Sequence, residues 1–276
     1  MNKSEAKTVL RYPGGKQRAV KILSEYIPPD ESEICSPFLG GGSFELYCVS
    51  VLGIPVYGYD NFLPLVEFWQ TLLFRRELLA EKSAEFLPVL KRDDFYELQK
   101  TQATLPAKLE RAAAFYVINR ASFSGCTLSG GMSPGHPRFT PSAVERVRRF
   151  PSAKIKPFFS ADKMDFADSI ASHKRGLIYA DPPYILKNQN LYGARGNGHR
   201  GFEHEKLRDI LLARGGRWLL SYNDCKYARR LYKGHAMLTP RWRYGMSNDK
   251  NSRELLVLSD ELSQTLSDFR GRRVAA

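Results

Sequence analysis

The fold is decided by LIYADPPY at positions 177–184, in the second half of the chain. The apolar residues Leu177 to Ala180 indicate a buried strand, and the prolines at 182 and 183 end it and stiffen the loop that follows. Open α/β sheets place their active sites in loops at the carboxyl ends of parallel strands. The stretch therefore predicts a parallel sheet with an active site that begins at Asp181.

Other short apolar runs resemble 177–180, because each stops at loop or acidic residues. Helical patterns lie between these runs. One follows Pro13-Gly14-Gly15, and another spans Glu205 to Ala213 and ends at Gly215-Gly216. The alternation predicts an α/β fold with a largely parallel sheet. The further predicted strands are Ile34 to Ser36, Val56 to Tyr59, Trp218 to Tyr222 and Leu255 to Leu258.

Between residues 65 and 150 the strand pattern fades and helical periodicity replaces it. It covers 65–90 and 107–118, and Thr140-Pro141 is a typical helix start for 141–149, with the threonine as cap. We therefore expect a catalytic core of residues 1–64 and 151–262, a helical insert of residues 65–150, and a basic tail of residues 263–276. Disorder is expected for the last part of this tail, residues 268–276.

The charge of the chain favours a polyanionic partner. It has 276 residues, with 42 Lys plus Arg against 29 Asp plus Glu, and a formal net charge of +13. Basic side chains on a binding face release counterions from phosphates, although a basic surface can also serve solubility alone. The four cysteines form no C-x-x-C pair and the five histidines no H-x-x-x-H pattern. No metal site, disulfide scaffold or membrane span is predicted, and a cytoplasmic location is expected.

The residue types after the strand suit chemistry on an exocyclic amino group. The lone pair of adenine's amino nitrogen is delocalised into the ring. A carboxylate from Asp181 and the backbone carbonyl of Pro182 can accept its two N–H hydrogens and localise that lone pair. Tyr184 offers an aromatic face against which a flipped base can stack. The alternative is a rigid Pro-Pro turn, which requires neither the acid nor the tyrosine.

Two further segments suggest a nucleoside pocket. The loop Phe38-Leu39-Gly40-Gly41-Gly42 follows a predicted strand, and glycines let a backbone approach a ligand closely. The next strand ends in Asp60, where a carboxylate can accept from ribose hydroxyls. Near the N-terminus, Arg11 to Lys16 indicates a Gly-Gly loop that opens a helix with Lys16 in its first turn, where the lysine could hold a carboxylate. The alternative is a simple turn before a helix.

Together these motifs resemble the Dam-type (D12 class) adenine-specific DNA methyltransferases, in the motif order of their alpha group. The resemblance implies a Rossmann-like, S-adenosylmethionine-dependent core with an inserted helical target-recognition domain. D-P-P-Y matches the catalytic signature, which implies catalytic roles for Asp181, Pro182 and Tyr184. R-Y-P-G-G-K, P-F-L-G-G-G and a D-F pair match the cofactor motifs. The cofactor residues implied are Tyr12, Lys16, Phe38, Gly40, Gly42, Asp60, Asp165, Phe166 and Asp181.

The resemblance also covers the segment Asn119 to Gly125, which in the family leads into the loop that enters DNA. A plain helix exit and a buried network are the alternatives. Relatives that read GATC often carry an arginine shortly after that glycine, where it can pair with guanine. This chain has Leu128 there, so the GATC specificity is not carried over. The DNA-binding residues predicted are Asn119, Arg120, Ser124, Arg138, Arg146, Ser247 and Asn248, with Arg148 and Arg149 as further candidates.

The sequence thus predicts transfer of a methyl group from S-adenosylmethionine to the N6 amino group of a flipped adenine in duplex DNA. No metal is expected, and the enzyme is expected to act as a monomer or weak dimer. Alternatives are methylation of the amino group of cytosine, methylation of RNA, and a DNA-binding relative without activity. Enzymes that methylate protein glutamine more often carry N-P-P-Y, so Asp181 argues against that substrate.

Overall fold

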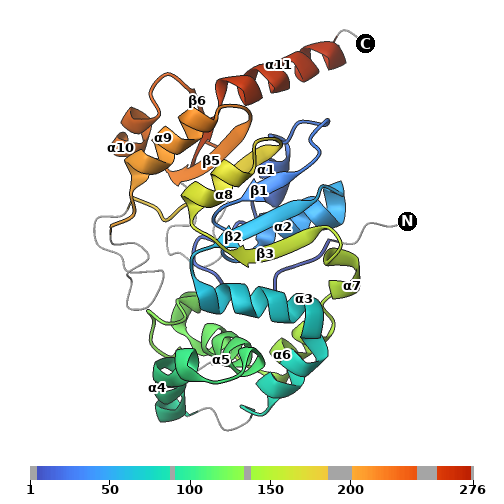
Figure 1. The fold of residues 1–276 in the computed structure, drawn as a ribbon, viewed down its shortest axis with the longest axis vertical. Coiled ribbons are helices and arrows are strands. Elements are labelled where there is room, and N and C mark those ends of the chain that lie inside the picture. The colour runs from blue at the N-terminus through green and yellow to red at the C-terminus, as the bar shows by residue number, and fades with distance from the viewer. Residues whose placement is uncertain (1–4, 88–90, 134–137, 186–200, 241–253, 275–276) are drawn as a thin grey trace.

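The centre of the molecule is a mostly parallel β-sheet flanked by helices (Figure 1). The computed structural model describes residues 5–87, 91–133, 138–185, 201–240 and 254–274. Within these residues the sheet has seven strands in the order β3-β2-β1-β4-β5-β7-β6, and β7 runs antiparallel to its neighbours. The strands are β1 (Ile34–Ser36), β2 (Val56–Asp60), β3 (Phe159–Lys163), β4 (Leu177–Ala180), β5 (Trp218–Asn223), β6 (Ala236–Leu238) and β7 (Glu254–Leu258).

This sheet confirms the predicted α/β fold, and the five predicted strands match β1, β2, β4, β5 and β7 to within one residue at each end. The strands that the pattern missed, β3 and β6, form the two edges of the sheet. β3 alternates buried with partly buried residues before it becomes exposed, and β6 has only three partly buried or exposed residues. Edge strands face water on one side and therefore lack the continuous apolar run of a central strand.

The helices pack on the sheet and, in one region, on one another. Figure 1 shows α3, α4, α5 and α6 gathered beside the β2–β3 edge. The helices that the structure describes are α1 (Val20–Ser24), α2 (Ser43–Tyr47), α3 (Leu63–Ala84), α4 (Arg92–Thr101), α5 (Lys108–Ala121), α6 (Pro141–Arg148), α7 (Ser152–Ile155), α8 (Phe166–Ser172), α9 (His204–Arg214), α10 (Lys226–Leu231) and α11 (Asp260–Val274); shorter turns of other helix types lie at Cys48–Leu52, Gln102–Thr104 and Phe123–Gly125.

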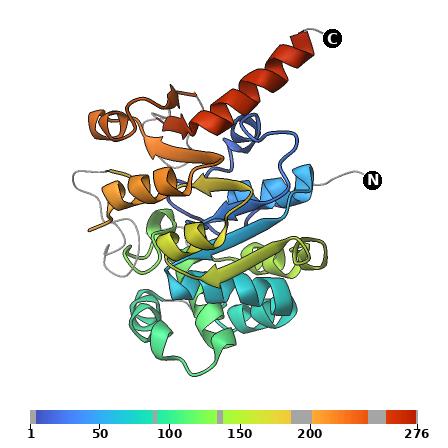
Figure 2. The ribbon, with the colours of Figure 1, turned by 45° about the horizontal axis from the view of Figure 1, so that its top comes forward.

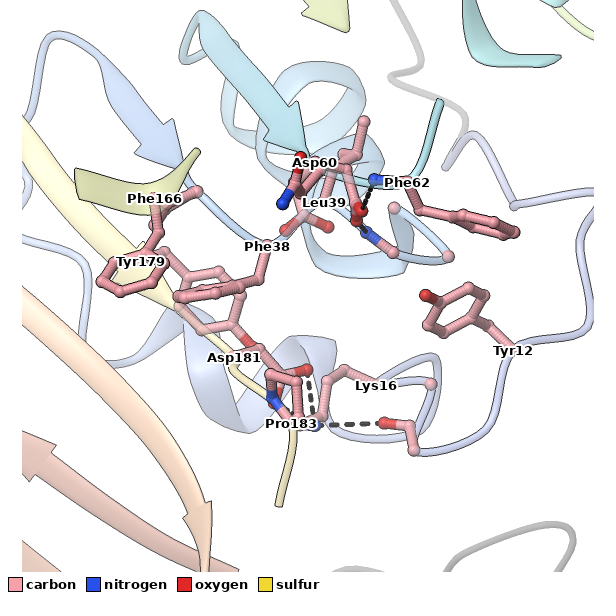
Figure 3. A pocket seen from close by; sticks show the side chains of 18 of the residues that line it. Tyr12, Lys16, Phe38, Leu39, Asp60, Phe62, Phe166, Tyr179, Asp181 and Pro183 are labelled. Atoms are coloured by element: carbon pink, nitrogen blue, oxygen red, sulfur yellow. Dashed lines mark hydrogen bonds and ion pairs between the residues drawn. The ribbon is translucent and has the colours of Figure 1, made fainter. Parts of the chain in front are cut away.

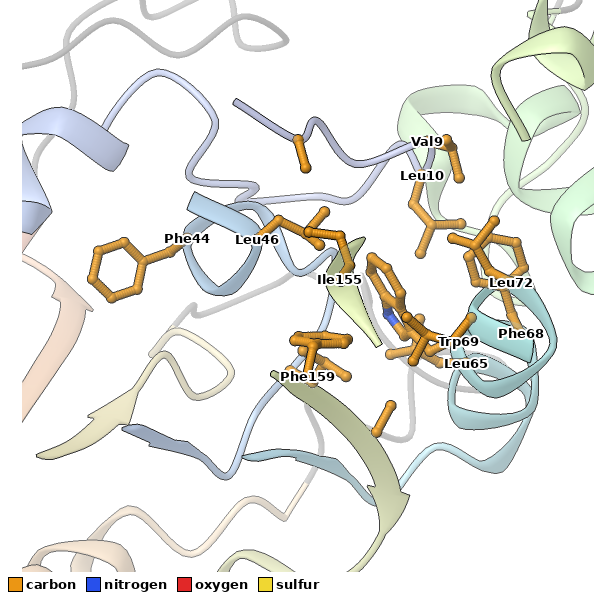
Figure 4. Packing of buried hydrophobic residues seen from close by; sticks show 14 of the residues in the cluster. Val9, Leu10, Phe44, Leu46, Leu65, Phe68, Trp69, Leu72, Ile155 and Phe159 are labelled. Carbon is orange, nitrogen blue, oxygen red and sulfur yellow. The ribbon is translucent and has the colours of Figure 1, made fainter. Parts of the chain in front are cut away.

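Helix α3 joins the helical region to the sheet. Its Trp69 ring packs edge-on against Phe159 of β3, with centroids 5.5 Å apart, and its Phe68 ring stacks on Tyr116 of α5 at the same distance. Figure 4 shows Phe68, Trp69 and Phe159 within one cluster of buried residues that runs from the sheet into the helices, and Tyr116 belongs to the same cluster. The expected boundary between residues 64 and 65 falls inside α3, and the division into core and insert stays a prediction.

The C-terminal segment differs from the expectation of disorder, because α11 continues to Val274 (Figure 2). Leu262 and Leu266 lie one helical turn apart and are buried against the core, which anchors the first half of the helix. The start of α6 also differs in detail. Thr140 occupies the cap position, but its side chain makes no capping hydrogen bond and contacts Ser142 Oγ instead (3.0 Å).

The chain order across the sheet reverses between β1 and β4. From β1 the chain proceeds outward through β2 to β3, and it then returns to β4 on the other side of β1. In open α/β sheets the loops diverge at such a switch point and leave a crevice beyond the carboxyl ends of the strands. The glycine loop after β1 and the D-P-P-Y segment after β4 both begin there.

Candidate active site

A cavity of about 510 Å³ lies beyond the carboxyl ends of β1, β2 and β4 (Figure 3). Its volume falls within the range of about 300–1,000 Å³ that is typical of small-molecule sites. All nine residues for which the family resemblance implied cofactor contacts line this cavity, although they come from five separate segments of the chain. They are Tyr12, Lys16, Phe38, Gly40, Gly42, Asp60, Asp165, Phe166 and Asp181.

The glycine loop is shaped by the protein's own aromatic side chains. Gly42 has a φ of +64° and precedes α2, and a Cβ there would lie 2.6 Å from the ring of Trp69. A Cβ at Gly41 would lie 2.7 Å from Cβ of Tyr12. Trp69 Nε1 also donates to the carbonyl of Gly40 (3.1 Å). The loop thus requires glycines because Tyr12 and Trp69 pack on it, a reason that the sequence does not reveal.

Two carboxylates at strand and helix ends hold the loops around the cavity. Asp60, the last residue of β2, accepts from the backbone N–H groups of Gly40 (3.0 Å) and Phe62 (2.9 Å). Burial raises its pKa to about 6, and these two hydrogen bonds oppose the rise. Asp165 caps α8 by accepting from the N–H of Ala167 (2.9 Å). Both carboxylates line the cavity while they fix the backbone.

Three phenylalanine rings form an apolar slot in the cavity wall. Phe38 follows β1, and its ring stacks on Phe166 of α8 with a centroid distance of 5.6 Å and an interplanar angle of 29°. Phe202 closes the group at 5.6 Å from Phe38 and 5.4 Å from Phe166. Sequence analysis did not identify Phe202, because an aromatic residue in a loop carries no local signal of the cavity that it lines.

The charged groups around the cavity are mainly acidic. Glu45 of α2 was also missed by sequence analysis. Its carboxylate accepts from Ser36 Oγ (2.7 Å), and burial raises its pKa to about 7. The hydroxyl of Tyr179 is buried on the same wall and has no hydrogen-bond partner among the described residues. Among the lining residues that the structure describes, the carboxylates outnumber the ammonium of Lys16; they are Glu45, Asp60, Asp165, Asp181 and Glu203.

Lys16 binds the carboxylate of the D-P-P-Y segment. Its Nζ donates to both oxygens of Asp181 (2.8 and 2.7 Å), to the hydroxyl of Tyr184 (2.9 Å) and to the carbonyl of Gly14 (3.0 Å). Lys16 also precedes α1 by several residues, so it lies outside the first helical turn expected from the sequence. The Asp181 side chain is 22 % exposed, and burial raises its pKa against the opposing effect of Lys16.

The other two predicted catalytic residues of D-P-P-Y, Pro182 and Tyr184, follow Asp181. Pro182 is buried and Tyr184 is half-buried, and neither is part of the cavity lining, unlike Asp181 and Pro183. The Tyr184 hydroxyl donates to Glu254 at the start of β7. Glu254 is 1 % exposed and also accepts from Ser221 Oγ of β5 (2.8 Å). Glu254 was not predicted as a site residue, since it enters the site from a strand late in the chain.

Two of the predicted DNA-binding residues, Asn119 and Arg120, are buried in this structure and bond to the protein's own backbone. Asn119 accepts from the backbone N–H of Arg11 (3.0 Å) and donates to its carbonyl (2.7 Å). Arg120 is 6 % exposed and donates to the carbonyls of Val9 and Arg138. These residues join the N-terminal segment to the end of α5, as in the alternative of a buried network.

The remaining predicted DNA-binding residues have different surroundings. Ser124 has a φ of +52° in a tight turn and is half-buried. The side chains of Arg138 and Arg146 are exposed. Two predicted residues, Ser247 and Asn248, lie outside the described residues. Of the further candidates, Arg148 and Arg149 are both exposed and form ion pairs with Glu145 (3.0 and 2.6 Å).

The described part of the chain has neither a cluster of metal-binding side chains nor a helix that could span a membrane. Within residues 5–87, 91–133, 138–185, 201–240 and 254–274, no group of three or more His, Cys, Asp or Glu side chains is placed to hold a metal ion. Over the same ranges, no helix has the length and apolar character to cross a membrane.

Comparison with known proteins agrees with the geometry of the site. The chain is 23 % identical over 254 residues to a DNA N-6-adenine-methyltransferase of Escherichia phage P1. The match covers 82 % of this chain but 31 % of that relative, so the chain spans about a third of the relative's length. The model of the D12 class N6 adenine-specific DNA methyltransferases matches residues 12–246, which contain both the glycine loop and D-P-P-Y. Because this match covers well over half of the chain, the protein belongs to the D12 class N6 adenine-specific DNA methyltransferase family.

Proposed function

We propose that this protein transfers the methyl group of S-adenosylmethionine to the N6 amino group of adenine in duplex DNA. The observation that carries the proposal is that Asp181 of D-P-P-Y is partly exposed on the wall of the cavity that the glycine loop also lines. The family match supports a methyl-transfer reaction. The DNA methyltransferase named for the phage P1 relative supports adenine in DNA as the substrate.

The cavity fits S-adenosylmethionine by its charge and shape. This donor carries an electrophilic methyl group on a sulfonium and has a net positive charge, which suits a wall in which carboxylates outnumber ammonium groups. The slot formed by Phe38, Phe166 and Phe202 suits the flat adenine ring of the donor. Asp60 remains available to ribose hydroxyls, because a carboxylate can accept about four hydrogen bonds and Asp60 accepts two from the backbone.

The residues of D-P-P-Y provide the acceptor side of the reaction. The Asp181 carboxylate accepts one N–H of the target amino group, and the Pro182 carbonyl accepts the other, which localises the nitrogen lone pair toward the methyl group. S-adenosylmethionine, held by the residues of the cavity wall, would supply the electrophilic methyl group, and its sulfur would keep the electron pair of the broken carbon–sulfur bond. The surplus proton on the nitrogen then leaves through the Asp181 carboxylate to solvent. Tyr184 stacks against the target base, which must leave the duplex to reach this site.

The helical region from α3 to α6 is the proposed target-recognition module. The net charge of +13 supports a polyanionic substrate. Arg138 and Arg146 are the proposed phosphate contacts, because both lie within this region and have exposed side chains. Asn119 and Arg120 instead support the module from within. We infer that the enzyme acts in the cytoplasm as a monomer or weak dimer.

The test is to incubate the purified protein with unmethylated genomic DNA and S-adenosylmethionine and to digest the product for nucleoside mass spectrometry. We expect N6-methyldeoxyadenosine, and sequencing of the methylated positions then identifies the recognition site. Appearance of N4-methyldeoxycytidine alone would replace adenine by cytosine as the target base. Absence of any methylated deoxynucleoside, with methylation of RNA in a parallel incubation, would overturn the proposal for DNA.

The matched variant is Asp181→Ala. It should abolish methyl transfer and leave DNA binding in a gel-shift assay within about threefold of the wild type, because a carboxylate on the cavity wall contributes little to phosphate contacts. Retention of more than a tenth of the wild-type rate would refute the role of Asp181.

A further inference from the structure

The resting arrangement of Lys16 conflicts with the proposed role of Asp181. Lys16 donates to both oxygens of Asp181 (Figure 3). It also donates to the Tyr184 hydroxyl and to the Gly14 carbonyl, so its three protons are shared among four acceptors. The Asp181 carboxylate is therefore engaged in a bidentate ion pair. The target amino group must also bind an oxygen of this carboxylate. Both donors draw on the charge and the lone pairs of one carboxylate, so binding of the base favours release of at least one Asp181 oxygen by Lys16.

Lys16 cannot simply be left without a counter-ion. Its side chain is 4 % exposed, and an uncompensated charge at such a buried position is strongly unfavourable. A second described carboxylate, Glu254, lies 3.8 Å from the same Nζ. Movement of Nζ by about 1 Å would bring it to the usual distance of a charge-assisted hydrogen bond.

Glu254 is held in place to receive this charge. One of its oxygens accepts from the Tyr184 hydroxyl and the other from Ser221 Oγ (2.8 Å), so the carboxylate is fixed by two neighbours and is 1 % exposed. The flexible partner is Lys16, whose side chain has four rotatable bonds. The Tyr184 hydroxyl contacts both groups and therefore bridges the start and the end of the movement.

We propose that Glu254 is a positioning residue that receives the Lys16 ammonium when the target amino group takes its place on Asp181. This inference rests on the proposed function and deepens it. The exchange keeps the buried cation paired throughout and frees the Asp181 carboxylate only when a base is present. Glu254 does not touch the base, and it acts through Lys16.

The test is a double-mutant cycle with Glu254→Gln and Lys16→Met. Glutamine keeps the hydrogen-bonding shape of Glu254 but removes its charge. We expect Glu254→Gln to lower the single-turnover methylation rate about tenfold or more, with the affinity for S-adenosylmethionine unchanged, because an acceptor for a buried charge is lost. In the Lys16→Met background no ammonium needs a new partner. There Glu254→Gln should change the rate by less than about twofold.

A second experiment measures DNA affinity for the same set of variants under conditions in which no methyl transfer occurs. S-adenosylhomocysteine is added, and each protein is titrated with a duplex that contains the mapped recognition site and with a duplex in which the site is scrambled. In the otherwise wild-type protein, Glu254→Gln should lower the ratio of the affinity for the site duplex to the affinity for the scrambled duplex. In the Lys16→Met protein, Glu254→Gln should leave this ratio unchanged. Glu67→Gln is the matched control, because Glu67 is a buried ion-pair partner of Arg111 outside the cavity lining. The rate of this variant should stay near that of the wild type.

Equal losses from Glu254→Gln in both backgrounds would show that Glu254 only supports Tyr184, and would overturn the inference. A Glu254→Gln variant as active as the wild type would overturn it as well. Neither result would affect the proposed function, which stands or falls on whether the wild-type protein methylates adenine.

Discussion

Replacing Glu45 by glutamine should change how the stability of this protein depends on pH. The Glu45 side chain is 3 % exposed and accepts from Ser36 Oγ (2.7 Å). Burial is the main cause that raises its pKa from 4.5 to about 7. Between these two values the folded protein keeps a proton that the unfolded chain has released. The free energy of unfolding therefore falls as the pH rises through this window and levels off above it.

The size of the effect follows from the shift in pKa. A rise from 4.5 to about 7 corresponds to about 3.4 kcal/mol, at about 1.4 kcal/mol per pH unit. This is the total stability that the wild type loses as the pH rises. Part of it is lost below pH 5, and about 2.5 kcal/mol is lost between pH 5 and pH 8. Glutamine has no such ionisation, and its carbonyl can still accept from Ser36. Any constant cost of burying its amide cancels when the two pH values are compared.

The assay is urea unfolding followed by far-ultraviolet circular dichroism at pH 5 and pH 8. The stability of Glu45→Gln minus that of the wild type should increase by about 2.5 kcal/mol from pH 5 to pH 8, because the wild type loses stability over this range and the variant does not. Glu25→Gln, at an exposed position, is the control for loss of one negative charge. A relative stability of Glu45→Gln that differs by less than about 0.5 kcal/mol between pH 5 and pH 8 would refute the reasoning that burial penalises this carboxylate.

Further predictions concern the cavity, the contacts of Asn119 and Gly125 with the N-terminal segment, and the basic surface. Phe38→Ala should weaken S-adenosylmethionine binding about tenfold in calorimetry, because one face of the aromatic slot is lost. Asn119→Ala should lower the free energy of unfolding in urea by about 2–4 kcal/mol, because it strands the backbone N–H and carbonyl of Arg11. Gly125→Ala should lower the melting temperature by at least about 4 °C. Its φ is +75° and its Cβ would lie 2.2 Å from the Arg11 carbonyl oxygen. Arg146→Gln should reduce the slope of log affinity for DNA against log salt by about 1, with an unchanged melting temperature.

Each of these predictions can fail separately. An unchanged affinity in Phe38→Ala would exclude the aromatic slot as the donor site. A variant Asn119→Ala that keeps its stability but loses DNA affinity would restore the DNA-contact role that its burial contradicts. Normal melting of Gly125→Ala would show that the loop relaxes without strain. An unchanged salt slope would remove Arg146 from the phosphate contacts.

The sheet could be predicted from the sequence because its central strands carry local signals. A strand covered on both faces is apolar along most of its length, as are β4 and the first half of β5, Trp218 to Leu220. The edge strands β3 and β6 do not, and α4 was missed as well. Its ten residues include only two buried side chains, Phe95 and Leu98, so the helical apolar pattern is too sparse to recognise.

The site could be predicted only in part, because motifs reveal which residues gather but not what each one contacts. Lys16 resembles a ligand-binding lysine at the start of a helix, yet its partner Asp181 lies 165 residues away in sequence. Asn119 and Arg120 resemble a polar helix end facing a ligand, yet the N-terminal segment covers them. Glu45, Phe202 and Glu254 carry no motif at all.

The α/β class, the family and the segments that line the cavity could be predicted from the sequence, because buried strands and glycine or proline loops leave local patterns. The carboxylate that Lys16 binds, the polar side chains that are buried and the acids that share the cavity became known only from the folded structure. Those outcomes depend on contacts between residues far apart in the chain. Desolvation and pairing of charge are set by all the elements that pack around a group, and no single segment encodes them.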